Sequence, residues 1–294
     1  MRKRDFQLGL IGWPLEHSLS PIIHTAAMQA LGLGGAYRLL PVRPTSQGDK
    51  QLKTCLDRIR IGELDGLNVT RPYKTTVMKH LDELTPVAEA IGAVNTISAM
   101  DGRLVGDNTD KDGFLIDLEA TLSPEVGGAL ILGSGGAARA VALGLAESGW
   151  QVWVSARCLD QAEELVDGLR SRGALAISGI PLSSRVIESI SPDCGLIVNA
   201  TPLGMSPQTK TSPWPADVPL PSAVVVYDLV YAPRETVLTI AASEAGLAAV
   251  TGVGMLVEQA ALSFERWTGL TAPRSVMRRT ALAALSTQES TGGG

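Results

Sequence analysis

Short apolar runs alternate with segments of helical periodicity along most of the chain. In the first part, we predict strands at residues 6–12 and 37–42, from Gly66 to before Pro72, and at 93–98. A second series of predicted strands lies at residues 129–132, 152–154, 196–198 and 224–227. Helices separate the strands, such as those predicted from Ser20-Pro21 onward and over 52–59. Such alternation is typical of α/β folds with largely parallel sheets.

The two series predict two α/β domains, as a length of 294 residues also suggests. We place the first, mainly parallel domain at residues 1–112 and the second at 113–254. Two late helices, 255–267 and 275–285, are expected to pack back on the first domain, so that 255–294 completes it. A functional cleft is expected between the domains. The polar, glycine-rich residues from 286 onward are expected to be disordered.

Composition excludes several classes of partner. Lys and Arg number 25 against 30 Asp and Glu, a net charge of -5, which gives no electrostatic case for nucleic acid or an anionic membrane. No apolar run approaches the roughly eighteen residues of a membrane span. Three widely spaced cysteines, Cys55, Cys158 and Cys194, show no metal-type pairing and fit a reducing cytoplasm. We therefore expect the protein to bind a small-molecule substrate and to have no metal site.

The segment Gly-Ser-Gly-Gly-Ala-Ala at residues 133–138 follows a predicted strand and precedes an alanine-rich helix. Gly133 permits a tight turn, Gly135 lets the backbone approach a pyrophosphate, and Ala138 takes the third small position of a dinucleotide-binding turn. The helix N-terminus would add free N–H groups and a positive dipole end. A plain strand–helix turn is the alternative, but the context favours a dinucleotide.

The end of the next strand indicates which dinucleotide is bound. An NAD site usually carries an acid there for the ribose hydroxyls. This chain has Arg157 instead, which can pair with a 2′-phosphate, so NADP is favoured over NAD. Asp160 lies nearby and keeps NAD open, and Arg157 could also be a solvated loop residue.

Polar residues gather at the predicted strand ends of the first domain. The run from Gly66 to Lys74 places one lysine on a loop that Pro72 stiffens, although an ordinary surface lysine is the local alternative. Ser18 and Ser20 lie on the loop after the first strand, where Ser20 could instead cap a helix. Ligands of open α/β sheets bind beyond the carboxyl ends of strands. The residues there suit a small polyol acid and also include Asn68, Thr70, Asn95 and Asp110.

From Leu8 to about Gly269 the chain resembles the shikimate dehydrogenase family. The resemblance is carried, in order, by G-W-P-L-E-H-S-L-S-P-I-I-H, G-L-N-V-T-R-P-Y-K, I-G-A-V-N-T, G-D-N-T-D, G-S-G-G-A-A-R, N-A-T-P-L-G-M, Y-D-L-V-Y-A-P and G-M-L-V-E-Q-A. It implies a substrate domain and a Rossmann domain. It also implies NADPH-dependent reduction of 3-dehydroshikimate to shikimate, on the route to chorismate and the aromatic amino acids.

The resemblance also implies roles for individual residues. Ser18 and Ser20 would hold the substrate carboxylate, and Lys74 and Asp110 would form the catalytic pair. The implied ligands of the ring hydroxyls are Thr70, Asn95, Asp110 and Gln259, with Tyr231 lining the pocket. The implied cofactor residues are Gly133, Ser134, Gly135, Gly136 and Ala137 for the pyrophosphate, Arg157 for the 2′-phosphate, and Thr201, Leu229, Gly252 and Met255 for the adenosine or nicotinamide side. Leu229 and Met255 could instead belong to the core.

One departure concerns the cofactor loop, which has Cys158 and Gln161 where NADP-specific members commonly carry threonine and a second basic residue. A quinate or quinate/shikimate dehydrogenase that uses NAD is therefore a rival, although Ser20 and Arg157 favour shikimate. A non-catalytic ligand sensor is a second rival, which the Lys74–Asp110 pair disfavours. A homodimer is left open, with no sequence feature that selects it.

Overall fold

The computed structural model describes residues 5–122, 124–174 and 176–292. The chain divides into two units, Met1–Asp110 with Val257–Gly294 (unit 1) and Lys111–Leu256 (unit 2). Sequence reasoning placed these divisions after residues 112 and 254. Within the described ranges, no helix is long and apolar enough to cross a membrane.

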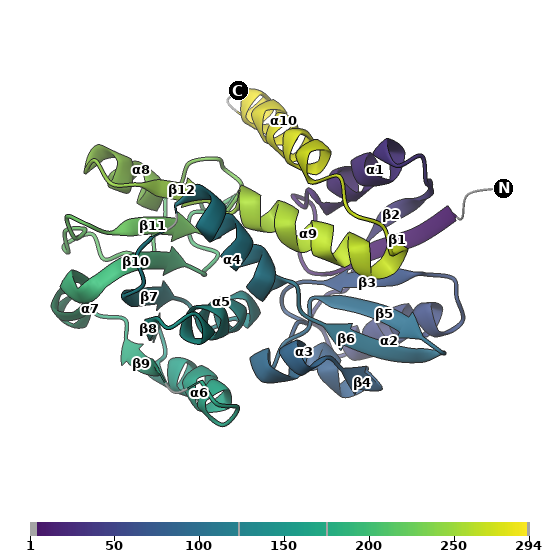
Figure 1. Ribbon diagram of the computed structural model, residues 1–294, viewed down its shortest axis with the longest axis horizontal. Coiled ribbons are helices and arrows are strands. Elements are labelled where there is room, and N and C mark those ends of the chain that lie inside the picture. The colour runs from purple at the N-terminus through teal and green to yellow at the C-terminus, as the bar shows by residue number, and fades with distance from the viewer. Residues whose placement is uncertain (1–4, 123, 175, 293–294) are drawn as a thin grey trace. The chain divides into compact units, whose positions relative to one another are not determined.

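Unit 1 contains a mixed six-stranded sheet in the order β2-β1-β3-β5-β6-β4 (Figure 1). Only β5 runs against the other strands, so the expectation of a mainly parallel sheet is confirmed. The strands are β1 (Asp5–Gly12), β2 (Gly34–Pro41), β3 (Gly66–Val69), β4 (Glu83–Leu84), β5 (Thr96–Met100) and β6 (Arg103–Asp107).

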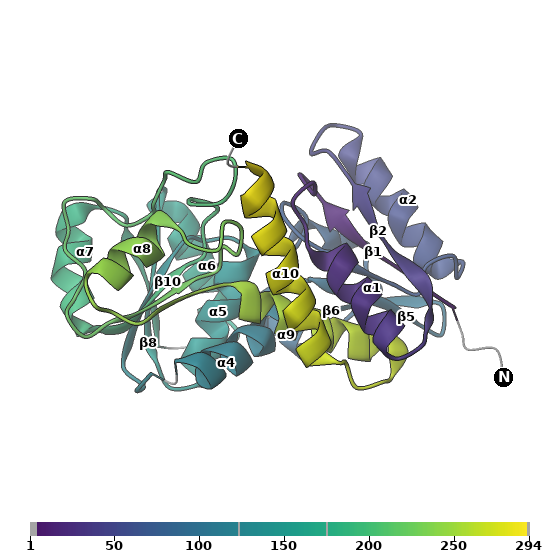
Figure 2. The same cartoon turned by 90° about the horizontal axis from the view of Figure 1, so that it is seen from above.

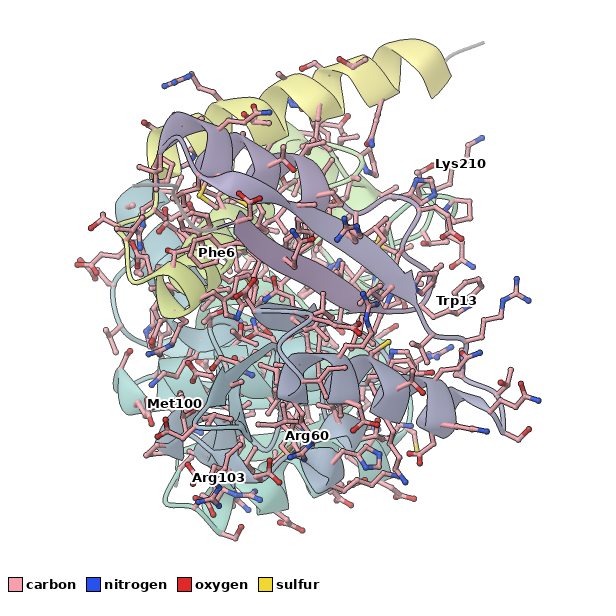
Figure 3. All side chains as sticks on the ribbon, turned by 90° about the vertical axis from the view of Figure 1, so that its right-hand side faces the viewer. Phe6, Trp13, Arg60, Met100, Arg103 and Lys210 are labelled. Atoms are coloured by element: carbon pink, nitrogen blue, oxygen red, sulfur yellow. The ribbon has the colours of Figure 1, made fainter. Side chains whose placement is uncertain are left out.

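The β5–β6 hairpin was not predicted. Asp101 and Gly102 form its turn, both with positive φ (51° and 76°), as a two-residue hairpin turn requires. Met100 and Arg103 face each other across this turn and are labelled in Figure 3. An Asp-Gly pair between alternating apolar residues is a recognised hairpin signal, so the sequence did contain the information.

Helices cover both faces of this sheet. In β3, Leu67 and Val69 face a core cluster that includes Leu52 and Leu56 of α2. The alternate residues face the other way: a Cβ on Gly66 would lie 2.1 Å from Trp267 Nε1 of α9. The helices of unit 1 are α1 (Ser20–Ala30), α2 (Gly48–Arg60), the 3₁₀ helix η1 (Thr76–His80), α3 (Pro86–Ile91), most of α9 (Val253–Thr268) and α10 (Arg274–Gly292).

Helix α10 lies alongside α1 in both ribbon views (Figures 1 and 2). It continues to Gly292, so the expectation of disorder from residue 286 onward is wrong for 286–292. The last two residues of that segment, 293–294, lie outside the described residues. Figure 3 labels Phe6 near the start of β1 and Trp13 just beyond its end, where the loop that leads to Ser18 begins.

Unit 2 is a parallel six-stranded sheet in the order β12-β11-β10-β7-β8-β9, which confirms the predicted Rossmann-type fold. The central strand β7 is buried along its whole length, as a strand covered on both faces must be. Its strands are β7 (Gly128–Leu132), β8 (Gln151–Ala156), β9 (Ile177–Pro181), β10 (Cys194–Asn199), β11 (Val225–Asp228) and β12 (Ala249–Thr251), of which β9 and β12 were not predicted.

Helices α7 and α8 pack on one face of the unit 2 sheet through Ile187 and Leu238. Helices α5 and α6, which follow β7 and β8, lie on the opposite face (Figures 1 and 2). The helices of unit 2 are α4 (Asp110–Thr121, which starts at the last residue of unit 1), α5 (Gly136–Glu147), α6 (Leu159–Arg170), α7 (Ser184–Ile190), the 3₁₀ helix η2 (Ser191–Asp193) and α8 (Val237–Glu244).

A histidine occupies the core of unit 1 beneath α9. The ring of His24 on α1 is fully buried and stacks on Tyr37, with centroids 4.4 Å apart and planes 4° apart. The ring of Trp267 lies 5.6 Å away. Burial lowers the pKa of His24 to about 3 from its ordinary 6.5, because a charged imidazolium would lose its hydration there.

We expect His24 to make folding stability depend on pH. Between its unfolded pKa of 6.5 and its folded pKa of about 3, only the unfolded state binds the proton, so acidification destabilises the fold. The slope from this group approaches about 1.4 kcal/mol per pH unit. Urea unfolding of wild type and His24→Leu between about pH 7 and pH 5 should show a shallower dependence in the variant.

Met28→Leu, which replaces another buried side chain of α1, controls for repacking and should keep the wild-type slope. Equal slopes in wild type and His24→Leu would show that the folded state protonates His24 as readily as the unfolded state does.

Candidate active site

Lys74 is held on a short, well-anchored loop after β3. The Tyr73 N–H donates to the Thr70 carbonyl (3.0 Å), and the Val94 N–H donates to the Lys74 carbonyl (2.7 Å). These bonds tie the loop to itself and to the segment that leads into β5. The Lys74 side chain is only 17% exposed, so the alternative of a solvent-exposed surface lysine is wrong.

The Lys74 ammonium pairs with the Asp110 carboxylate, with Nζ 2.5 Å from Oδ2. Asp110 is the first residue of α4 and is buried. Its other oxygen, Oδ1, accepts a hydrogen bond from Asn95 Nδ2 (2.8 Å), and its backbone N–H donates to Asn108 Oδ1 (2.9 Å). Both carboxylate oxygens therefore have donors, as a buried charge requires.

Asn95 is fixed in turn by the residues around it. Its Oδ1 accepts from the Thr109 N–H (2.8 Å) and from Thr96 Oγ1 (2.9 Å). Its Nδ2 reaches Gln259 Oε1 on α9 at 3.5 Å. The structure thus brings together four of the sequence-predicted substrate residues, Lys74, Asn95, Asp110 and Gln259, from parts of the chain far apart in sequence.

Ser18 and Ser20 lie at the start of α1. The Ser20 N–H donates to Ser18 Oγ (3.3 Å). The N-cap position of α1 is Leu19, without a side-chain cap, so the alternative of Ser20 as the cap is wrong. Burial raises the pKa of Tyr37 on the neighbouring β2, and its hydroxyl donates to Asn68 Oδ1 (2.8 Å).

Thr70 lies at the end of β3 beside the end of β1. Its N–H donates to the Ile11 carbonyl (2.9 Å), and its methyl group lies 2.3 Å from where a Cβ on Gly12 would be. Among residues 5–122, 124–174 and 176–292, no direct hydrogen bond joins Ser18, Ser20 or Thr70 to the Lys74–Asp110 pair. These residues form a separate part of the candidate substrate site.

The glycine turn of unit 2 fits a phosphate group. Gly133 has φ +119°, and its N–H donates to the Ser155 carbonyl (2.7 Å), which fixes the tight turn. Gly135 is the N-cap of α5, and a Cβ there would meet nothing within 4 Å. Open space in front of the free N–H groups of a twelve-residue helix suits an anion. Ser134, Gly136 and Ala137 complete this turn.

Arg157 is exposed directly after β8, at the strand end where a dinucleotide's adenosine ribose is recognised. Asp160 lies in the first turn of α6, where a carboxylate stabilises the helix by its interaction with the dipole. Stabilisation of α6 is therefore an alternative to a ligand role for Asp160.

The loops after β10 and β11 are joined by a buried carboxylate that sequence reasoning did not single out. Asp228 Oδ1 accepts from Asn199 Nδ2 (2.8 Å) and the Val230 N–H (3.0 Å), and Oδ2 accepts from Thr236 Oγ1 (2.7 Å). Burial nevertheless raises the pKa of Asp228. The Thr201 hydroxyl donates to Asn199 Oδ1 (2.7 Å), so this network also orients Thr201.

The remaining predicted cofactor residues cluster around the same loops. A Cβ on Gly252 would lie 2.2 Å from the Leu229 carbonyl oxygen, so this position requires glycine. Leu229 and Tyr231 are half-buried after β11, and Met255 is buried in the first turn of α9. A core role for Met255 is thus as consistent with its burial as a ligand contact.

Sequence reasoning missed a second set of polar residues, which lie next to Asn95. Thr96, Thr109 and Ser263 are buried and hydrogen-bonded to one another. The one sequence signal was a serine within the apolar stretch of α9, at Ser263.

Comparisons with known proteins find close relatives along nearly the whole chain. A family described as "Shikimate dehydrogenase substrate binding domain" matches residues 10–97, and one described as "Shikimate 5'-dehydrogenase C-terminal domain" matches 252–282. The chain is 42% identical to the shikimate dehydrogenase (NADP(+)) of Symbiobacterium thermophilum, over 96% of this chain and 95% of that protein. The corresponding protein of Methanopyrus kandleri is also 42% identical, with 95% of each chain covered.

Two solved structures are similar to this one. Shikimate 5-dehydrogenase from Thermus thermophilus, in complex with NADP(H) and shikimate, has a TM-score of 0.83 and 38% identity, covering 95% of this chain and all of that chain. Quinate dehydrogenase from Corynebacterium glutamicum, in complex with NAD, has a TM-score of 0.86 and 34% identity, covering 95% of this chain and 99% of that one.

We expect Gly135→Ala to separate dinucleotide binding from stability. The added methyl group meets no protein atom, and φ there is -78°, so the thermal midpoint should not change. It would occupy the space through which a pyrophosphate approaches the helix, so affinity for NADP+ should fall at least about tenfold. Calorimetric titration and thermal unfolding measure the two effects.

Gly127→Ala is the matched control, because a Cβ there also meets nothing within 4 Å but the residue lies before β7, away from the turn. Wild-type NADP+ affinity in Gly135→Ala would argue against a phosphate site at the turn.

Proposed function

Because the chain belongs to the shikimate dehydrogenase family, we propose that it catalyses the reversible, NADPH-dependent reduction of 3-dehydroshikimate to shikimate. The observation that carries this proposal is the Lys74–Asp110 ion pair at the strand ends of unit 1, in which Asp110 is buried and the Lys74 side chain is 17% exposed. Reactions of this kind add a hydride to a ketone carbon and a proton to its oxygen. A proton donor must therefore lie within hydrogen-bond reach of that oxygen.

We propose Lys74 as this donor. Its ammonium carries the proton, and the Asp110 carboxylate limits the positions that Nζ can take, which favours a productive geometry. In the reductive direction Lys74 gives its proton to the developing alkoxide. In the oxidative direction a neutral Lys74 amine takes the hydroxyl proton, so that direction needs the lysine deprotonated first.

The other polar residues of unit 1 would hold the substrate. Ser18 and Ser20, whose hydroxyls lie at the start of α1, are proposed to bind the carboxylate. Thr70, Asn95 and Gln259 are proposed to bind the ring hydroxyls together with Asp110, and Tyr231 to line the pocket. The position of Asn95, whose Nδ2 contacts both Asp110 Oδ1 (2.8 Å) and Gln259 Oε1 (3.5 Å), supports this division, because it would place ring hydroxyls near the proton donor.

The turn of unit 2 would hold the cofactor. We propose Gly133, Ser134, Gly135, Gly136 and Ala137 as the pyrophosphate site and Arg157 as the ligand of the 2′-phosphate, with Thr201, Leu229, Gly252 and Met255 on the adenosine or nicotinamide side. The open space at Gly135 supports this assignment. When bound, NADPH supplies the hydride. The Asp228 network would keep the Thr201 hydroxyl in place beside it.

Oxidation of quinate with NAD is the second candidate, because the quinate dehydrogenase of Corynebacterium glutamicum is similar over nearly the whole chain. The exposed Arg157 favours NADPH, since a guanidinium suits a phosphate better than a ribose hydroxyl. A cytoplasmic location is a further proposal that rests on the cysteine usage of the sequence, whereas no feature of the sequence selects a homodimer.

We expect Lys74→Met to lower kcat for shikimate oxidation about 10²- to 10⁴-fold, the range that general acid–base catalysis contributes. The substitution keeps the length of the side chain but removes the proton carrier. Steady-state kinetics with shikimate and NADP+ measure the effect. Lys79→Met is the matched control, because Lys79 follows on the same segment but pairs with Asp49 on the surface (3.0 Å).

If Lys74→Met kept the wild-type kcat and altered only KM, the lysine would have no part in the chemical step.

We expect Arg157→Ala to reduce the preference for NADPH over NADH. A charged hydrogen bond contributes about 1.5–3 kcal/mol, so kcat/KM for NADPH should fall by roughly 10- to 100-fold while that for NADH stays the same. Arg170→Ala removes a guanidinium from the last turn of α6, at the opposite end of that helix from Arg157, and should change neither value. A parallel fall with both cofactors would contradict a 2′-phosphate contact at Arg157.

A further inference from the structure

Ser263 lies at the centre of a buried polar network in unit 1. It is on α9, one turn after Gln259, and none of its surface is exposed. Its Oγ lies 2.7 Å from Thr96 Oγ1, 3.0 Å from Asn68 Nδ2 and 3.1 Å from Thr109 Oγ1. It also lies 2.9 Å from the Gln259 carbonyl oxygen. A single hydroxyl group therefore contacts β3, β5, the residue before α4 and the preceding turn of α9.

The proton count of these groups allows a direction for the bonds that reaches Asn95. Each hydroxyl can donate only once. Ser263 Oγ and Thr109 Oγ1 both lie within donating distance of the Gln259 carbonyl (2.9 and 3.0 Å), and when Thr109 donates there the Ser263 proton is available for Thr96. Thr96 then donates to Asn95 Oδ1 (2.9 Å). Ser263 in turn accepts from Asn68 Nδ2, so every hydroxyl is satisfied in one consistent arrangement.

This arrangement is a directed chain that ends at the catalytic carboxylate. Asn68 donates to Ser263, Ser263 to Thr96, and Thr96 to Asn95. Asn95 then uses its Nδ2 protons for Asp110 Oδ1 (2.8 Å) and Thr109 Oγ1 (2.9 Å).

At its other end, the chain continues to Tyr37 of β2. The Tyr37 hydroxyl donates to Asn68 Oδ1 (2.8 Å).

We propose that Ser263 is a positioning residue for the reaction. It contacts none of the reacting groups. By donating to Thr96 it directs the Thr96 proton to Asn95, and this bond holds the Asn95 amide against Asp110. The Asp110 carboxylate, which binds Lys74, is oriented in this way. This inference rests on the proposed function, because it assigns Ser263 to the same Lys74–Asp110 chemistry.

A purely structural role for Ser263 would be a hydrogen bond to the preceding turn of its helix. Thr268, at the other end of α9, makes such a bond, since its Oγ1 donates to the Phe264 carbonyl (2.8 Å). Thr268 has no contact with the Asn68–Thr96–Asn95 group among the hydrogen bonds of the described residues. It therefore provides a control for loss of a helix back-bond without loss of the network.

The test compares wild type, Ser263→Ala and Thr268→Ala with shikimate and NADP+. We expect Ser263→Ala to lower kcat about tenfold, because small misplacements of catalytic groups are costly, while KM for NADP+ stays within about twofold. Thr268→Ala should keep the wild-type kcat. Ser263→Cys, which keeps the volume of the side chain, should give an intermediate kcat and provides a second variant if the alanine variant does not fold.

A double-mutant cycle with Thr96→Val tests the direction of the chain. If Ser263 acts through the Thr96 hydroxyl, adding Ser263→Ala to Thr96→Val should lower kcat no further. Additive losses, or a kcat of Ser263→Ala equal to wild type, would overturn the positioning role alone. Absence of turnover by the wild-type protein with shikimate and NADP+ would overturn the proposed function as well.

Discussion

The ion pair between Lys74 and Asp110 requires hydrogen-bond partners, and much of unit 1 supplies them. Two charges taken out of water are costly unless they are paired and their remaining hydrogen-bonding groups are satisfied. Asp110 is buried, and its second oxygen is satisfied by Asn95. Asn95 in turn needs partners for its own amide, which β5, the Asn108-Thr109 turn and α9 supply. The burial of one carboxylate thus requires hydrogen-bond partners for Asp110 and, in turn, for the residues that bind it.

This demand explains why the residues converge from distant parts of the chain. Lys74 follows β3, Asn95 precedes β5, and Asp110 starts α4 at the last residue of unit 1. The carboxyl end of β3 and the start of antiparallel β5 meet at the same edge of the sheet, so their flanking loops lie together. Helix α9, which lies mostly in unit 1, packs on the face of β3 where Gly66 leaves room for Trp267.

The sequence sufficed for the strand-end residues but not for their support. Lys74 and Asp110 could be placed near a site because polar residues at strand ends mark one in α/β folds, and the family resemblance then paired them. Asp101-Gly102 carried a hairpin signal that identifies β5 and β6. Ser263 could not be assigned, because its partners Asn68 and Thr109 lie more than 150 residues away and a lone serine on an apolar helix has no distinguishing pattern. Long-range packing decides which buried hydroxyl has a role.

Cofactor choice in unit 2 follows a different physical rule from substrate positioning in unit 1. The glycine turn offers backbone N–H groups and open space, which suit the pyrophosphate of NAD and NADP equally. We propose that discrimination comes from Arg157, which is exposed. An exposed guanidinium acts through a high dielectric and is screened by salt, whereas the buried Lys74–Asp110 pair is screened much less. Selectivity for NADP should thus depend on ionic strength, while the catalytic geometry is set by the interior of unit 1.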